Sequence, residues 1–186
     1  MSFSDCRSSR VVLVSHCLLN ANVKVCGLAR YNAVHSAVAD VIAASGCGIV
    51  QLPCPEFLFL GLKRWWQSKA QYDTPAYRRH CAMLAESVVD QVVMYRSGGV
   101  DVAGFLAVEG SPSCGLSQVY DHPEWGGRPC DVDTASAKCA GRGIWMEELL
   151  ASFDRRGILA TPLYGVGSEA DEAAVPEALR SFLAAG

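Results

Sequence analysis

The chain has 186 residues, 51% of them hydrophobic, which is enough to bury one substantial core but not two comfortable ones. Its formal net charge is −3 and its basic runs are short, as at Lys63-Arg64, which argues against nucleic acid or an anionic membrane as the main partner. We find no secretion signal and no membrane-spanning stretch. We therefore expect a single cytoplasmic domain, residues 1–186, that binds a small molecule; the oligomeric state stays open.

The spacing of apolar residues predicts strands that alternate with helices. The best-defined helix begins at Thr74, a capping residue followed by Pro75, and its apolar positions recur every three or four residues as far as Tyr95. Residues 57–66 are interpreted as a lid or packed loop, and residues 114–141 as a long irregular segment. Strands are predicted at about 11–14, 48–52, 102–108 and 158–164, with further helices at about 31–45, 145–153 and 176–183.

This alternation predicts the fold class α/β, with about four strands in a mainly parallel sheet and helices on both faces, as in Rossmann-like and flavodoxin-like proteins. In the expected strand order, 2-1-3-4, the first three strands are neighbours about 4.8 Å apart. Their carboxyl ends would share one edge, where folds of this class place their sites.

Three of the predicted strands lead directly to a cysteine: Cys17, Cys54 and Cys114. We expect the three thiols to converge within about 10 Å at the sheet edge. Without an export signal, cysteines stay reduced, which favours metal or catalytic use over disulfides. The alternative is three buried structural cysteines.

The other six cysteines carry weaker signals. No Cys-x-x-Cys pair occurs, so a zinc finger or a thioredoxin-type motif is not expected. Cys26, Cys47 and Cys81 are interpreted as small apolar packing residues and Cys6 as part of the terminus, while Cys130 and Cys139 stay unassigned.

Thiolates are soft ligands that select iron–sulfur clusters, zinc or copper(I). A cubane cluster takes four ligands, so three cysteines leave one iron open to a substrate atom. The expected spacing suits such a cluster and, with some loop adjustment, a single metal ion.

The motifs Ser15-His16-Cys17-Leu18-Leu19-Asn20, Cys54-Pro55-Glu56 and Ser111-Pro112-Ser113-Cys114-Gly115 resemble those of the thiouracil desulfidase family and its uncharacterised relatives. The resemblance covers about residues 11–164. It implies an oxygen-sensitive [4Fe-4S] cluster with Cys17, Cys54 and Cys114 as its metal ligands, whose open iron takes the sulfur of a thiolated nucleobase. By motif position, it implies catalytic roles for Glu56 and Ser111. Ser113 and Asn20 are further candidates for substrate contacts, with roles in turns as the alternative.

The residues alone leave two other function classes open. One is a cysteine hydrolase or amidotransferase in which Cys114 is the nucleophile, His16 or His122 is the base and Glu56 orients the base. The other is a non-enzymatic metal carrier or redox sensor built on the same three thiols. Glu56 could also be a surface carboxylate, and Ser111 a turn residue before a proline.

Overall fold

The structure, a computed structural model, describes residues 5–122, 125, 127, 136–158, 161–167 and 175–185. A parallel four-stranded sheet in the order β2-β1-β3-β6 forms its centre, and β4 and β5 form a separate antiparallel pair. This is the predicted order of the four strands along the sheet. The strands are β1 (Arg10–Val14), β2 (Gly48–Gln51), β3 (Asp101–Val108), β4 (Gln118–Tyr120), β5 (Lys138–Ala140) and β6 (Leu163–Val166).

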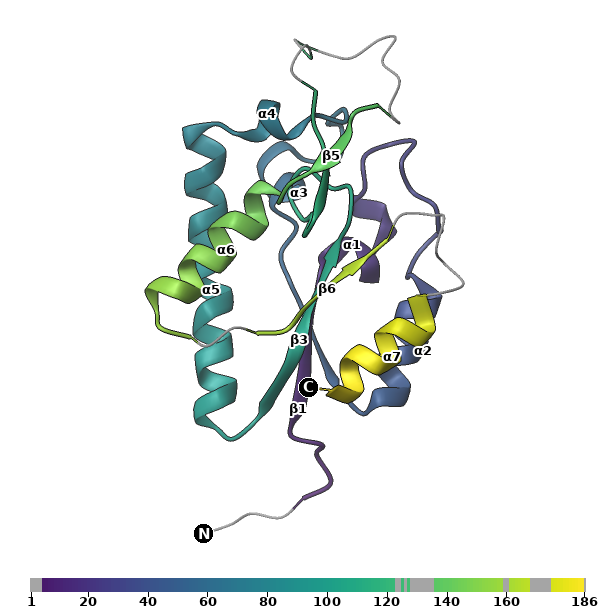
Figure 1. The fold of residues 1–186 in the computed structure, drawn as a ribbon, viewed down its shortest axis with the longest axis vertical. Helices are drawn as coiled ribbons and strands as arrows, with labels where there is room; N and C mark the ends of the chain where they lie inside the picture. Colours follow the sequence, from purple (N-terminus) through teal and green to yellow (C-terminus); the bar gives the residue numbers. More distant parts are fainter. Residues whose placement is uncertain are drawn as a thin grey trace.

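Helices cover both faces of the parallel sheet, as predicted. In Figure 1, α5 and α6 lie to the left of the sheet, and α2 and α7 lie to its right. The helical elements are α1 (His16–Leu19), the 3-10 turn η1 (Ala21–Val23), α2 (Ser36–Ser45), α3 (Pro55–Leu60), α4 (Lys69–Tyr72), α5 (Pro75–Ser97), α6 (Ile144–Arg155) and α7 (Val175–Ala185). The α/β fold class is therefore confirmed.

None of the helices within the described ranges is both long and apolar enough to cross a lipid bilayer.

The central strand β1 is apolar on both faces because each face packs against a helical layer. Val12 and Val14 pack in the core under α2 and α7, whereas Val11 and Leu13 pack in the core under α5 and α6. Burying one such aliphatic side chain contributes roughly 1.5–3 kcal/mol. This two-sided burial fixes the register of β1, and with it the position of the residues that follow the strand.

The helix starts follow local sequence rules. Thr74 accepts a hydrogen bond from the amide of Tyr77 at 3.2 Å, and Pro75 occupies the first turn of α5, as predicted. The helix predicted over 31–45 begins later, at Ser36, because Tyr31 instead donates to the carbonyl oxygen of Cys17 at 2.7 Å and packs against His35.

Two predicted loops contain regular structure. Residues 55–60 form α3, which begins at Pro55 and ends at Gly61, a glycine with φ of 75°. The prediction of a lid or packed loop over 57–66 is therefore wrong for residues 57–60, which are helical. The segment predicted as irregular, 114–141, contains the β4–β5 pair, and residues 123–124, 126 and 128–135 lie outside the described residues.

The last strand begins later than predicted. Pro162 accepts a hydrogen bond from Phe105 at 2.9 Å but has no N–H to donate, so the ladder of β6 begins only at Leu163. Of the predicted strand 158–164, residues 159–160 lie outside the described residues.

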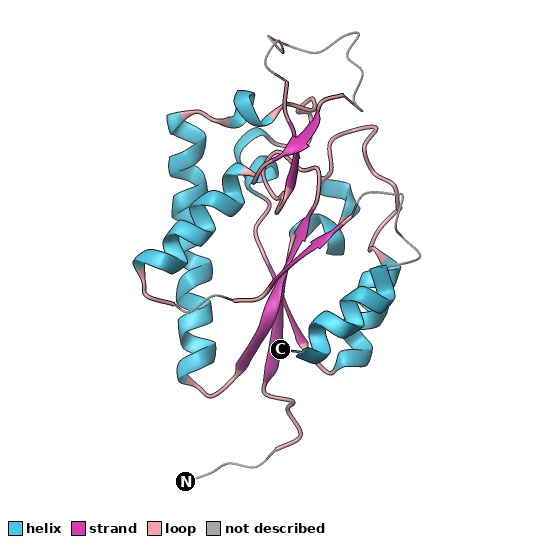
Figure 2. Cartoon of the chain, in the orientation of Figure 1, coloured by secondary structure: helices cyan, strands magenta, loops and turns pink. Residues whose placement is uncertain are grey.

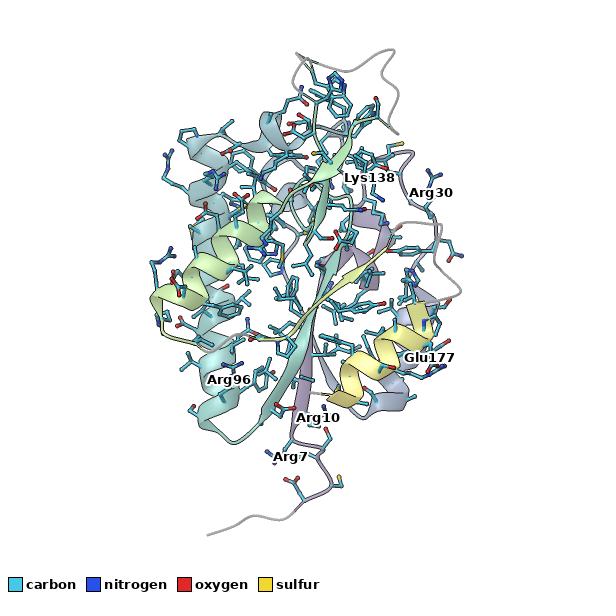
Figure 3. The ribbon with its side chains drawn as sticks, in the orientation of Figure 1. Arg7, Arg10, Arg30, Arg96, Lys138 and Glu177 are labelled. Carbon is cyan, nitrogen blue, oxygen red and sulfur yellow. The ribbon has the colours of Figure 1, made fainter. Side chains whose placement is uncertain are left out.

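The amino end of the sheet is tied by Arg10, which donates to Asp101 of β3 at 3.2 Å and to the carbonyl oxygen of Leu183 in α7 at 3.0 Å. Figure 3 places Arg7, Arg10 and Arg96 toward this end, and Arg30 and Lys138 toward the opposite end. The labelled cations are therefore divided between the two ends of the molecule.

Candidate functional site

The three predicted cysteines follow three adjacent strands. Cys17 lies in α1 directly after β1, Cys54 is the N-cap of α3 after β2, and Cys114 closes a turn after β3. Since these strands are parallel neighbours, all three cysteines follow carboxyl ends at one edge of the sheet, the upper one in Figure 2. The thiols are close enough to interact, because charge on Cys17 or Cys54 raises the pKa of Cys114.

Burial is the main influence on all three thiols. It raises the pKa of Cys54 to about 12, and the charge of Glu56 acts in the same direction. It raises the pKa of Cys114 well above the usual value for a thiol, and it raises that of Cys17 against the opposing charge of Lys24. Three thiolates here therefore need a cationic group among them, because binding such a group is what offsets the cost of deprotonation.

A buried hydroxyl without a partner lies beside the first cysteine. Ser15 is 2% exposed and precedes α1, but its side chain does not cap the helix. Its Oγ is buried and makes no hydrogen bond to any residue that the structure describes. Buried polar atoms nearly always have a partner, so this hydroxyl is suited to a polar or sulfur-rich group bound between the strand ends.

Within the described ranges, no group of three or more His, Cys, Asp or Glu side chains is arranged to hold a single metal ion. The three cysteines instead supply a soft, all-sulfur donor set at adjacent strand ends, and thiolates of this kind are the ligands of iron–sulfur clusters.

Glu56 is held by two donors on one oxygen. Arg64 Nε and the hydroxyl of Tyr72 each lie 3.2 Å from Oε2. The ion pair is buried, with the Arg64 side chain 3% exposed and that of Glu56 12% exposed. Among the described residues, Oε1 has no hydrogen-bond partner. The carboxylate therefore presents one free oxygen beside Cys54.

Arg64 and Tyr72 were missed by the sequence reasoning. The signal that could have indicated Arg64 is a basic residue within the otherwise apolar and aromatic stretch 57–66, where a buried cation calls for a nearby carboxylate. Tyr72 lies at the end of the four-residue α4, which has too little periodicity to be recognised from sequence.

Ser111 acts as a turn residue. Its Oγ accepts hydrogen bonds from the amides of Cys114 at 2.9 Å and Ser113 at 3.3 Å. The carbonyl oxygen of Cys114 accepts from the amide of Val108 at 3.2 Å, which joins the turn to the end of β3. The hydroxyl proton of Ser111 is not used by these bonds. Its catalytic role stays a prediction.

The two predicted substrate contacts have structural partners. Ser113 is fully buried, and its Oγ is 2.8 Å from the hydroxyl of Tyr77. Asn20 accepts from the amide of Asn22 at 3.1 Å and thereby caps η1. Their roles in substrate binding stay predictions.

The hydrolase alternative needs Glu56 to orient His16 or His122, and among the described residues Glu56 is hydrogen-bonded to neither. His16 Nδ1 is 3.1 Å from Gln51 Nε2, and His122 stacks on Trp125. Glu56 is bonded to Arg64 and Tyr72 instead. Because its pKa is raised, Cys114 is also a poor nucleophile on its own.

Of the other cysteines, Cys81 in α5 shares a core cluster with Cys114, and its charge raises the pKa of that thiol. Cys47 and Cys81 are buried, as predicted, but Cys26 is exposed because it lies in the turn that follows η1, so its assignment to an apolar face is wrong. Cys139 is exposed in β5 with its Sγ 3.7 Å from the carbonyl oxygen of Val119. Cys130 lies outside the described residues.

No family model matches the chain. The uncharacterised protein MJ0003 of Methanocaldococcus jannaschii is 28% identical to it over 153 residues, which are 82% of this chain and 83% of that protein. A solved structure of the [4Fe-4S]-dependent thiouracil desulfidase TudS is 22% identical, with a TM-score of 0.48, and the match covers 91% of this chain and 99% of the other.

Proposed function

We propose that this protein is a [4Fe-4S]-dependent desulfidase that converts the C=S group of a thiolated nucleobase or related thioamide into C=O. The observation that carries this proposal is the set of three thiols, two of them half-buried and that of Cys114 buried, that follow adjacent parallel strands with a carboxylate beside them. Cys17, Cys54 and Cys114 would hold the cluster. The motif resemblance agrees with this donor set.

When bound through three cysteines, such a cluster supplies an open iron that takes the substrate sulfur and draws electron density from the thiocarbonyl carbon. The overall exchange is hydrolytic: the C=S compound and water give the C=O compound and hydrogen sulfide. Neither an oxidant nor a reductant is consumed.

The chain's own residues would handle the protons and the orientation of the substrate. Glu56 would accept a proton from the attacking water through the free Oε1 and return it to the departing group. Ser111 uses its lone pairs for the turn, so its hydroxyl proton is available to a ring nitrogen or oxygen of the substrate.

The experiment is to purify the whole chain without oxygen and to measure its visible spectrum and its iron and sulfide content. We expect about four iron and four sulfide atoms per chain, a spectral change on adding thiouracil or sulfide, and bleaching in air. Incubation with thiouracil should release uracil and sulfide. A colourless protein that cannot be reconstituted would refute the cofactor.

The same measurements separate the other function classes. A coloured protein without turnover would favour a metal carrier or redox sensor, and a colourless protein with hydrolase activity would favour a cysteine nucleophile.

We further propose that residues 1–186 form one cytoplasmic domain whose partner is a small thiolated substrate.

A further inference from the structure

Arg64 is a buried cation with three acceptors in three directions. The residue is 8% exposed. Its Nε donates to Glu56 Oε2 at 3.2 Å, one terminal nitrogen donates to the carbonyl oxygen of Gly61 at 2.9 Å, and the other donates to that of Val23 at 2.7 Å. The planar guanidinium fork suits this set of acceptors, which a lysine ammonium could not contact in the same geometry.

These three contacts join the two segments that carry the first two thiols. Val23 belongs to η1, which follows the helix of Cys17. Glu56 lies in the first turn of α3, which begins after Cys54, and Gly61 is the C-cap of the same helix. One buried side chain thus holds the loop after β1 against the helix after β2.

The hydrogen bond from Arg64 also distinguishes the two carboxylate oxygens of Glu56. Arg64 and Tyr72 both donate to Oε2, and among the described residues no group donates to Oε1. A carboxylate anchored at one oxygen loses most of its rotational freedom, so its second oxygen is directed before any substrate arrives. Orientation of this kind contributes to rate because a reacting group misplaced by about 1 Å can cost roughly 100-fold.

We infer that Arg64 is the positioning residue of the site: with Tyr72 it fixes Glu56 by Oε2, so that Oε1 is the oxygen that exchanges protons with water and substrate. This inference rests on the proposed function, because it assigns a role to Arg64 within that reaction. Its three hydrogen bonds go to Glu56, Gly61 and Val23, so the proposed effect of Arg64 on the reaction is exerted through Glu56.

A merely structural ion pair would show itself differently. Breaking a buried pair destabilises a protein wherever the pair lies, and the resulting loss of activity is then independent of Glu56. If Arg64 positions Glu56, the loss of activity on replacing Arg64 should depend on the presence of the Glu56 carboxylate. A double-mutant cycle separates the two, because residues that act as a unit are not additive.

The test uses the cluster-loaded full chain with Tyr72→Phe and Arg64→Lys, each alone and combined with Glu56→Gln. Turnover of thiouracil is measured as kcat and KM, alongside iron content and urea unfolding. We expect Tyr72→Phe to lower kcat roughly tenfold with KM and iron content unchanged, and Arg64→Lys to lower kcat, expressed per loaded cluster, by roughly 100-fold with KM unchanged. Neither change should lower kcat further when Glu56→Gln is already present.

Arg78→Lys is the matched control, because Arg78 is also an arginine with several carboxylate partners, namely Asp73, Glu147 and Glu148, but it has no bond to Glu56. It should lower stability without lowering kcat. If Arg64→Lys fails to fold, Tyr72→Phe answers the question alone, since it removes a single hydroxyl.

The outcomes also distinguish the two proposals. Losses of kcat that are equally large with and without Glu56→Gln overturn the inference and leave the desulfidase intact. A wild-type chain that carries its cluster but never releases sulfide overturns the proposed function, and the role of Arg64 with it.

Discussion

Ser111 Oγ accepts a hydrogen bond from the amide N–H of Cys114 at 2.9 Å. The carbonyl oxygen of the same serine accepts from the amide of Gly115 at 2.9 Å. Gly115 has no room for a side chain, since a Cβ there would lie 2.3 Å from the carbonyl oxygen of Gln118 and 2.7 Å from that of Ser111. The turn that delivers the third thiol is therefore shaped by Ser111 and Gly115 together.

The first prediction concerns this turn. Ser111→Ala removes the acceptor of two amide hydrogens and should lower the free energy of unfolding of the metal-free chain by about 1 kcal/mol, as lost caps do. Ser111→Thr keeps the hydroxyl and should retain most of the stability. Urea unfolding measures both. An alanine variant as stable as the wild type would show that the contact contributes nothing to folding.

The second prediction concerns the cluster ligands. Serine in place of Cys17, Cys54 or Cys114 removes one soft ligand, so each variant should lose its visible absorption and most of its iron after reconstitution. Cys139→Ser is the matched control, because this thiol is exposed in β5, and it should stay coloured. If Cys139 were needed and one of the other three were dispensable, the sheet-edge site would be wrong.

The sequence predicted those parts of the fold that depend on burial. The strands β1 and β3 are apolar runs buried along most of their length, and Thr74-Pro75 marks the start of α5, so these elements were predicted correctly. The strand β2 was also predicted, although only Val50 of its four residues is buried. The placement of the three cysteines at one edge of the sheet could be predicted from the strand order, because neighbouring parallel strands end at the same edge.

The sequence could not predict features that depend on contacts between distant segments. The short helices α1, α3 and α4 are fixed by what they pack against rather than by periodicity, since isolated helices of this length are unstable. The pairing of Arg64 with Glu56 depends on where the chain after α3 turns back, and no local pattern encodes that.

The third prediction concerns Glu56. Glu56→Gln keeps the size of the side chain but cannot accept and return a proton, so turnover should fall roughly 100-fold or more. The cluster spectrum and its change on adding thiouracil should stay, because glutamine still accepts from Arg64 and Tyr72. Near wild-type turnover by a cluster-loaded Glu56→Gln chain would show that another group moves the proton.

The fourth prediction concerns acid stability. The hydrogen bond from Arg78 lowers the pKa of Asp73 below its usual value of 3.8. A lowered carboxyl pKa stabilises the folded chain above the unfolded pKa, and this contribution is lost as the pH falls through the folded pKa. Asp73→Asn should therefore cost about 0.2–1 kcal/mol at neutral pH, the range for exposed pairs, and progressively less below about pH 4. Urea unfolding across this range checks it; a cost that does not change with pH would contradict it.

The last prediction concerns Ser15, whose buried Oγ lacks a partner although the residue lies at the N-cap of α1. An unsatisfied buried hydroxyl costs about 1–3 kcal/mol, so Ser15→Ala should make the metal-free chain more stable. If the bound cluster gives this hydroxyl a sulfur acceptor, the same change should make the loaded chain less stable and shift its reduction potential to more negative values, because hydrogen bonds to cluster sulfurs raise the potential.

The test for Ser15 is whether the change in the free energy of unfolding caused by Ser15→Ala has opposite signs with and without the cluster. Urea unfolding of the wild type, Ser15→Ala and Ser15→Thr is compared with and without the cluster, under anaerobic conditions. Ser8→Ala is the control, since Ser8 lies in the exposed segment before β1 and its Oγ accepts one hydrogen bond, from the amide of Arg10 at 3.4 Å, so its effect should be small and the same in both states. Stabilisation by Ser15→Ala in both states, with an unchanged reduction potential, would mean that the hydroxyl does not face the cluster. The unpartnered Oγ of Ser15 would then destabilise the folded chain whether or not the cluster is bound.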